Sequence, residues 1–171
     1  MNVRPSVPRS TPSLTLLEMS IRLSDDEAWS VLEQSHTGIL TTLRADGAPI
    51  ALPIWFVVVD RTICFTTFDG TKKVRRIARD PRGSFLVESG LKWAELRAVH
   101  LSGSIEEISD PALIAVVEAA WDKKYQAFRT PQSEMPAATQ QHYARKRPYR
   151  LVPHGKLLTW DNSRIATRGS T

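Results

Sequence analysis

The sequence has no long hydrophobic run, a single cysteine and no histidine spacing typical of a metal site. No apolar stretch approaches the roughly 18 residues of a membrane-spanning helix, so the sequence predicts no membrane partner. Cys64 has no partner for an intramolecular disulfide, and it lies within an apolar strand pattern, which favours a buried thiol in a cytoplasmic protein. The four histidines are far apart, which argues against zinc and leads us to expect no metal.

Length and composition indicate one domain. With 171 residues, 42% of them hydrophobic, the chain is long enough for one compact core. Residues 1–21 are rich in proline, arginine, serine and threonine, and we expect a flexible tail there. The apolar patch at residues 14–17 is too short for a signal peptide, and Met19 is an alternative start. We therefore expect a domain over residues 22–161 and a short tail over 162–171.

The chain is basic, with a net charge of +5 and a pI near 9.7. One basic cluster lies within residues 72–82 and a second within 145–150. Such clusters suit a polyanion, but no DNA-binding or RNA-binding signature accompanies them. A small phosphorylated ligand explains the first cluster equally well, and we predict no nucleic-acid partner.

The pattern along the chain is mainly β. Ser24 and the acids after it predict a helix over residues 24–36. Three strands with tight turns between them follow over 38–44, 49–59 and 62–67. We further expect helices over 72–79, 110–121 and 137–146, and strands over 83–87, 95–108 and 149–160, the last interrupted at 153–155. Short connections between neighbouring strands favour an antiparallel barrel or sandwich over a parallel sheet.

The most informative segment joins a strand to a basic helix. It reads Phe65-Thr66-Thr67-Phe68-Asp69-Gly70-Thr71-Lys72-Lys73. Hydroxyl groups at a strand end, a glycine turn, free N–H groups at a helix start and two lysines together favour a phosphate. The spacing is not that of a P-loop. The alternative is that the basic run is only a solvated helix face.

This segment also carries a family resemblance. The pattern F-x-T-x-x-x-[ST]-[RK]-K, the turn Asp46-Gly47-Ala48-Pro49 and the later Asp80-Pro81-Arg82 occur in order. Over residues 22–161 the chain resembles the pyridoxamine 5′-phosphate oxidase-like split barrels, in particular their flavin/deazaflavin oxidoreductase branch. The resemblance implies a six-stranded antiparallel split β-barrel with peripheral helices. It also implies a homodimer with FMN or the deazaflavin coenzyme F-420 in a cleft between subunits, and the sequence does not distinguish the two cofactors.

The resemblance assigns roles to individual residues. It places the cofactor phosphate on Thr66, Thr67, Thr71, Lys72 and Lys73, with Arg75 as an addition. The ring system would lie on Pro53, Ile54, Trp55 and Phe56, and Arg97 would contribute across the dimer. The oxidases proper have Arg and Lys where this chain has Leu52 and Val57, and their C-terminal R-x-H motif has no match. Oxidation of vitamin B6 is therefore not the expected reaction.

The expected function is that of an oxidoreductase passing a hydride, through the bound cofactor, to a small conjugated or aromatic acceptor. No acid–base pair or nucleophile is evident, so no catalytic residue is assigned. The first alternative is a non-catalytic carrier or sensor that binds the same cofactor. The second is a haem-binding split barrel with His100 or His154 as the axial ligand.

Overall fold

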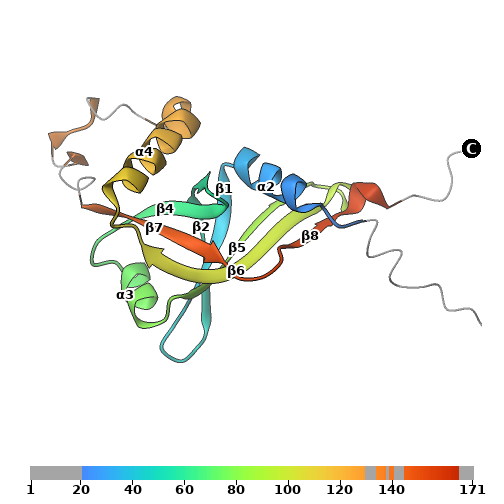
Figure 1. The fold of residues 1–171 in the computed structure, drawn as a ribbon, viewed down its shortest axis with the longest axis horizontal. Coiled ribbons are helices and arrows are strands. Elements are labelled where there is room, and N and C mark those ends of the chain that lie inside the picture. Colours follow the sequence, from blue (N-terminus) through green and yellow to red (C-terminus); the bar gives the residue numbers. More distant parts are fainter. Residues whose placement is uncertain (1–20, 130–133, 138, 141–144, 166–171) are drawn as a thin grey trace, which may run out of the picture.

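An antiparallel sheet curled into a half-barrel forms the body of the protein (Figure 1). The computed structural model describes residues 21–129, 134–137, 139–140 and 145–165. The strand order in the sheet is β2-β1-β5-β6-β7-β4-β3, and β8 pairs with β6. The strands are β1 (Thr37–Leu43), β2 (Pro49–Trp55), β3 (Val57–Val59), β4 (Thr62–Phe68), β5 (Arg82–Ser89), β6 (Arg97–Glu107), β7 (Lys146–Pro153) and β8 (Leu158–Asp161).

The prediction of one continuous strand over 49–59 is wrong, because the structure breaks this segment at Phe56 into two strands. Its first part, β2, pairs with β1, and its second part, β3, pairs with β4 at the opposite end of the sheet. Phe56 is fully buried, and its N–H and C=O both bond to the Tyr125 hydroxyl, at 2.9 and 2.7 Å. Because these groups are satisfied by a side chain, the segment turns a corner here without losing backbone hydrogen bonds.

The six-stranded split barrel is confirmed once the broken segments are counted. β2 and β3 form one segment. β7 and β8 form another, which pairs with β6 over Gly103–Glu107 and Arg97–His100 respectively. The predicted interruption at 153–155 therefore separates two strands, β7 and β8, that both pair with β6. Gly103 of β6 lies where a Cβ would come within 2.0 Å of the Val152 carbonyl oxygen, an approach that favours glycine.

The sheet is flanked by the helices α2 (Asp25–Gln34), α3 (Lys72–Arg79) and α4 (Pro111–Tyr125). Ser24 forms the capping box that its sequence predicts, with Glu27 as the partner. The Thr71 and Asp110 side chains cap α3 and α4 by accepting from Val74 N and Ala112 N. Short 3₁₀ turns, η1 (Trp93–Glu95), η2 (Gln126–Phe128) and η4 (Asn162–Arg164), complete the connections.

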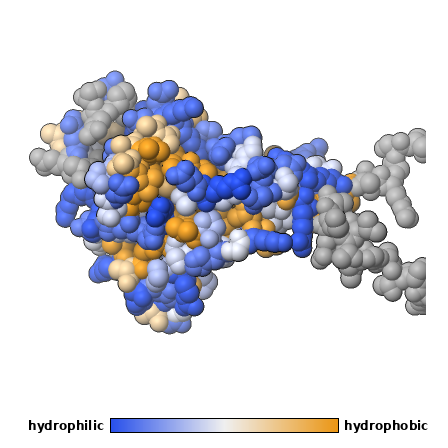
Figure 2. Space-filling model, in the orientation of Figure 1, coloured by the Kyte–Doolittle hydropathy of each residue, from blue (hydrophilic) through white to orange (hydrophobic). Residues whose placement is uncertain are grey.

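Two apolar clusters hold the helices to the sheet. Trp29 and Leu32 of α2 pack with Phe56 and Phe85 inside the half-barrel. Val117 and Tyr125 of α4 pack against the outer side of β3 and β4, on a cluster that includes the buried Cys64. Burial raises the pKa of the Cys64 thiol, as expected for an inert cysteine. Figure 2 shows apolar surface gathered over α4 and the neighbouring strands.

The fold continues past residue 161, because Arg164 bonds to Glu27 at 2.5 Å and Asn162 N to Leu96 O at 2.9 Å. The tails expected over 1–21 and 162–171 lie largely outside the described residues. Half of the helix expected over 137–146 also lies outside them; residues 137, 139 and 140 are helical, whereas residue 146 begins β7. No helix in the described ranges is long and apolar enough to cross a membrane. Those ranges also hold no cluster of metal-ligating side chains.

Candidate anion-binding site

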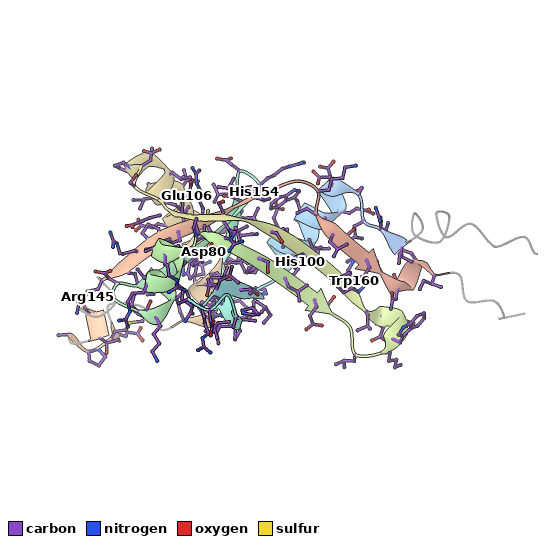
Figure 3. All side chains as sticks on the ribbon, turned by 90° about the horizontal axis from the view of Figure 1, so that it is seen from below. Asp80, His100, Glu106, Arg145, His154 and Trp160 are labelled. Atoms are coloured by element: carbon purple, nitrogen blue, oxygen red, sulfur yellow. The ribbon has the colours of Figure 1, made fainter. Side chains whose placement is uncertain are left out.

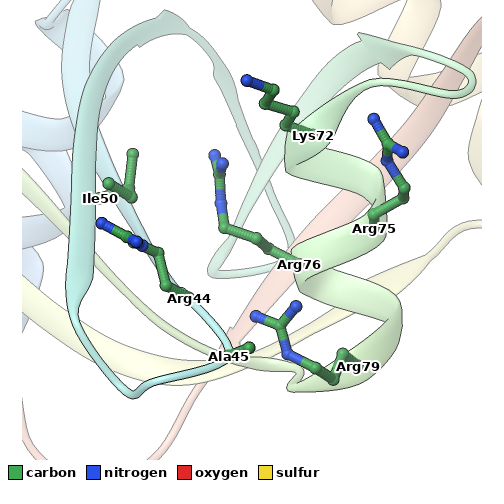
Figure 4. A pocket seen from close by; sticks show the side chains of 7 residues that line it. All are labelled: Arg44, Ala45, Ile50, Lys72, Arg75, Arg76 and Arg79. Atoms are coloured by element: carbon green, nitrogen blue, oxygen red, sulfur yellow. The ribbon is translucent and has the colours of Figure 1, made fainter.

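A basic pocket lies between α3 and the β1–β2 hairpin (Figure 4). Its volume is about 480 Å³. Five of its lining side chains are cationic and the other two are apolar. The lining consists of Arg44, Ala45, Ile50, Lys72, Arg75, Arg76 and Arg79. We call it the basic pocket.

Helix geometry explains why α3 places its cations together. Positions 72, 75, 76 and 79 follow the i, i+3, i+4, i+7 spacing of a single helix face. The opposite face buries Ile77 in the core. Arg76 Nε donates to Thr42 Oγ1 at 2.8 Å and Arg79 Nη2 donates to Leu43 O at 2.7 Å, so both guanidinium groups are bound to β1.

The charge of the pocket is poorly compensated. Within the described residues, the only ion pair made by a lining cation joins Arg44 to Asp46, at 3.4 Å between exposed side chains. Lys72 and Arg75 are exposed, and neither forms an ion pair with any residue that the structure describes. Surplus positive charge beside a helix start favours an anion, because both the ammonium groups and the free N–H groups attract it.

The predicted phosphate turn divides into two parts. Lys72 and Arg75 line the basic pocket, whereas Thr66, Thr67, Thr71 and Lys73 do not. Thr67 is buried, and the Thr71 hydroxyl accepts from Val74 N at 3.3 Å.

Lys73 lies on another side of α3, and its Nζ is 6.0 Å from the centroid of the Phe65 ring. Burial, and secondly the charge of Arg76, lowers the pKa of this lysine. A half-buried ammonium beside another cation is better stabilised by an anion than by water.

The four predicted ring contacts lie on the segment that leads away from the pocket. Ile50 of β2 lines the pocket, and Pro53, Ile54 and Trp55 follow on the same strand. Trp55 is 39% exposed and stacks on Tyr125, with centroids 4.4 Å apart and planes 4° from parallel. Phe56 is fully buried, so its side chain supports the strand from inside the barrel.

Arg97 lies at the other end of the sheet within one chain. It begins β6 opposite Ser89, and its Nε is 3.0 Å from Asp161 Oδ2, outside hydrogen-bond geometry. His100 lies on the same strand, half-buried, while His154 is exposed in the turn after β7 (Figure 3). One protomer therefore does not bring Arg97 or either histidine to the basic pocket.

The sequence pattern alone did not predict five of the lining residues: Arg44, Ala45, Ile50, Arg76 and Arg79. The helical spacing of Arg76 and Arg79 from Lys72 was a usable signal. No local sequence signal placed the hairpin residues Arg44, Ala45 and Ile50 in the site, because their position beside α3 depends on the pairing of distant strands.

Comparisons with known proteins agree with this fold. A family model described as pyridoxamine 5′-phosphate oxidase matches residues 24–146. No curated protein matches the chain. A conserved hypothetical protein from Mycobacterium tuberculosis has 27% sequence identity and a TM-score of 0.73, with 89% of this chain and 93% of that chain covered.

Two further structures share the fold. An FAD-binding protein from Mycobacterium smegmatis has 24% identity and a TM-score of 0.58, with 80% of this chain and 94% of that chain covered. A haem-binding protein from the same organism has 20% identity and a TM-score of 0.62, with 85% and 61% covered. Since the family model spans most of the sequence and the strand order is that of a split barrel, the protein belongs to the pyridoxamine 5′-phosphate oxidase family.

Proposed function

We propose that the basic pocket binds the phosphate of FMN or of a deazaflavin coenzyme, and that the protein is an oxidoreductase. The observation that carries the proposal is the set of five lining cations, of which only Arg44 forms an ion pair within the described ranges. A phosphate dianion would offset this charge, and each hydrogen bond to a charged group contributes about 1.5–3 kcal/mol.

β2 supplies the direction in which such a cofactor would extend. Pro53 and Trp55 lie three and five residues beyond Ile50, roughly 10 and 17 Å along an extended strand. Because β2 is an edge strand, a phosphate in the pocket on its inner side would leave the ring system along its free edge, within reach of Pro53 and Trp55 on the outer side. The exposed Trp55 ring, held from behind by Tyr125, offers a flat surface for stacking there, worth about 0.5–1.5 kcal/mol.

The residues orient the ligand more than they react with it. A bound flavin or deazaflavin supplies hydride transfer. Pro53 and Trp55 would keep water from one face of the ring and hold a small conjugated or aromatic acceptor beside it, and Ile54 would support them from the core side of the strand. The reacting proton would come from solvent, because none of the residues proposed to position the ring, Pro53, Ile54 and Trp55, carries an acid.

A homodimer is part of the same proposal. β2 is an edge of the path of paired strands, and it exposes apolar residues that include Leu52, at 45%, and Trp55. A second subunit would cover this apolar edge and enclose the ring. The cytoplasm, where reduced cofactors are regenerated and Cys64 would stay reduced, is the compartment that this proposal implies.

Titration of the purified protein with FMN and with the deazaflavin coenzyme tests the binding site. Lys72→Ala and Arg75→Ala should each weaken binding roughly ten- to a hundredfold, since 1.4 kcal/mol is a factor of ten. Lys123→Ala removes an exposed cation from α4 and is the matched control. Unchanged dissociation constants for the double variant Lys72→Ala/Arg75→Ala would overturn the assignment.

Reoxidation kinetics test the enzymatic part. The reduced complex should react with quinones, enones or nitroaromatics faster than the free reduced cofactor does. Equal rates across the panel would leave a non-catalytic carrier, which binds the same cofactor.

Haem binding is a second candidate function, favoured by the setting of His100. In the strand register its neighbours are Leu86 and Leu158, which give the half-buried imidazole apolar surroundings. Titration with haemin followed by absorbance tests it: His100→Ala should abolish the Soret shift, and His154→Ala should not. A shift retained in His100→Ala excludes this ligand.

A further inference from the structure

Aromatic side chains from three segments of the chain meet where β2 ends. Trp55 is the last residue of β2, His36 directly precedes β1, and Tyr125 and Phe128 are the last residues of α4 and η2. The register pairs Thr37 with Trp55, so the segments before β1 and after β2 are neighbours. We call the set of His36, Trp55, Tyr125 and Phe128 the aromatic corner.

One buried hydroxyl group fixes the aromatic corner. The Tyr125 hydroxyl lies 2.7 Å from the carbonyl oxygens of both His36 and Phe56, and it accepts from Phe56 N at 2.9 Å. Tyr125 itself is fully buried. The backbone on both sides of the corner is therefore held in place before any ligand arrives, which lowers the entropic cost of binding one.

The rings around Tyr125 are open to solvent. Trp55 stacks on one face of Tyr125 and is 39% exposed. Phe128 is 60% exposed, and its ring centroid is 4.8 Å from that of the exposed His36. Within the described part of the chain, these three side chains lie outside both apolar clusters of the core. Exposed aromatic surface that is firmly held and does not serve the core is typical of a binding site.

His36 is the polar group of the aromatic corner. Its imidazole meets the edge of Tyr125, with centroids 6.1 Å apart and planes at 72°. It forms no hydrogen bond or ion pair with any residue that the structure describes. An imidazole carries an N–H donor whether it is neutral or charged, so His36 can donate to an oxygen of a ligand. Arg129, the next cation along the chain from Phe128, is paired with Asp122.

The aromatic corner adjoins the place proposed for the cofactor ring. Trp55, on which that ring would stack, lies five residues beyond Ile50 of the basic pocket, roughly 17 Å along the strand. A molecule that rests on His36 and Phe128 would therefore lie beside the ring and far from the phosphate.

We propose that the aromatic corner binds the acceptor, a planar conjugated molecule with a carbonyl or nitro oxygen. Phe128 and the edge of Trp55 contact its apolar part, and the His36 imidazole donates a hydrogen bond to its oxygen. This inference rests on the proposed function, and it specifies where the substrate binds and which side chain selects it.

Equilibrium dialysis with two matched naphthalenes tests the site. Acetylnaphthalene carries a carbonyl oxygen, and ethylnaphthalene has the same ring system without it. Both should bind the protein with and without FMN, because the corner is complete in the chain itself. His36→Leu should weaken the binding of acetylnaphthalene about three- to tenfold, as expected for one lost hydrogen bond, and that of ethylnaphthalene less than about twofold. His36→Gln keeps an N–H donor and should recover most of the loss.

Two further variants locate the ligand. Phe128→Ala should weaken the binding of both naphthalenes at least threefold, because it removes an apolar contact that they share. His154→Leu, at an exposed histidine beyond β7, is the matched control and should change neither affinity. Equal losses for both naphthalenes in His36→Leu would overturn the hydrogen bond. Unchanged affinities in Phe128→Ala, or a wild type that binds neither compound, would overturn the site.

Titration with FMN and with the deazaflavin coenzyme separates this proposal from the one beneath it. If a cofactor binds but the naphthalenes do not, the aromatic corner is not the acceptor site and the cofactor site stands. If the naphthalenes bind and discriminate as expected but neither cofactor binds, the corner stands as a binding site and the proposed function fails.

Discussion

Replacing Lys124 should stabilise the protein, because its ammonium group is buried without a hydrogen-bond acceptor. Lys124 Nζ lies 4.2 Å from the centroid of the Phe56 ring and 5.7 Å from that of Tyr125, and it bonds to no polar atom in the described part of the chain. Burial lowers the pKa of Lys124 from 10.5 to about 8, against a smaller opposing effect of Glu33.

The sign and size of the effect follow from linkage. Between pH 8 and 10.5 the unfolded chain holds a proton on Lys124 that the folded chain has released, so stability rises with pH across this window. At neutral pH the charged amine costs at most about 3 kcal/mol, at 1.36 kcal/mol per pKa unit. Screening at a partly exposed side chain reduces this to about 1–2 kcal/mol, and the contacts with aromatic rings return roughly 0.5–1 kcal/mol.

Lys124→Met keeps the length of the side chain and removes the charge. Urea unfolding at pH 7, at equal protein concentrations, should show a gain of up to about 1.5 kcal/mol, the difference between these contributions. The gain should disappear near pH 10. Lys123→Met, at the exposed neighbouring position, should change stability by less than about 0.5 kcal/mol at either pH. A loss of stability in Lys124→Met at pH 7, or a gain independent of pH, would refute the reasoning.

Two further predictions concern the frame of the site. Tyr125→Phe leaves the Phe56 N–H without its hydrogen bond, so the free energy of unfolding should fall by about 1–3 kcal/mol. Thermal or urea unfolding measures this loss, and an unchanged midpoint would mean that water replaces the hydroxyl. Gly103→Ala pushes a methyl group against the Val152 carbonyl, so soluble yield and melting temperature should both fall. Ala98→Gly on the same strand is the control and should lower the melting temperature less. A fully stable Gly103→Ala protein would contradict the close approach.

Much of the fold could be predicted because its signals are local. The capping residues Ser24 and Asp110, the turns at Gly47 and at Asp60 and Arg61, and the spacing of α3 each depend on neighbours in sequence. Turn residues with positive φ and side-chain caps carry their physical reason within a few positions.

The corner at Phe56 could not be predicted, because the group that satisfies its backbone lies 69 residues away on Tyr125. An uninterrupted apolar run from Pro53 to Val59 gives no local sign that the strand changes neighbours. The residues of the site differ in the same way, because some could be predicted from the local sequence and others could not. The helix start suggested Lys72 and Arg75 from sequence, while Arg44 and Ile50 joined the pocket through strand pairing alone.

The strand order has a consequence for how the chain folds. The hairpins β1–β2 and β3–β4 need only short loops, so their pairings can form early, yet they lie at the two ends of the finished sheet. The strands between them, β5, β6 and β7, come later in the chain and must enter between structures already formed. Until residues 146–153 arrive, β4 and β6 each keep an open hydrogen-bonding edge, which makes a chain truncated before β7 prone to aggregation.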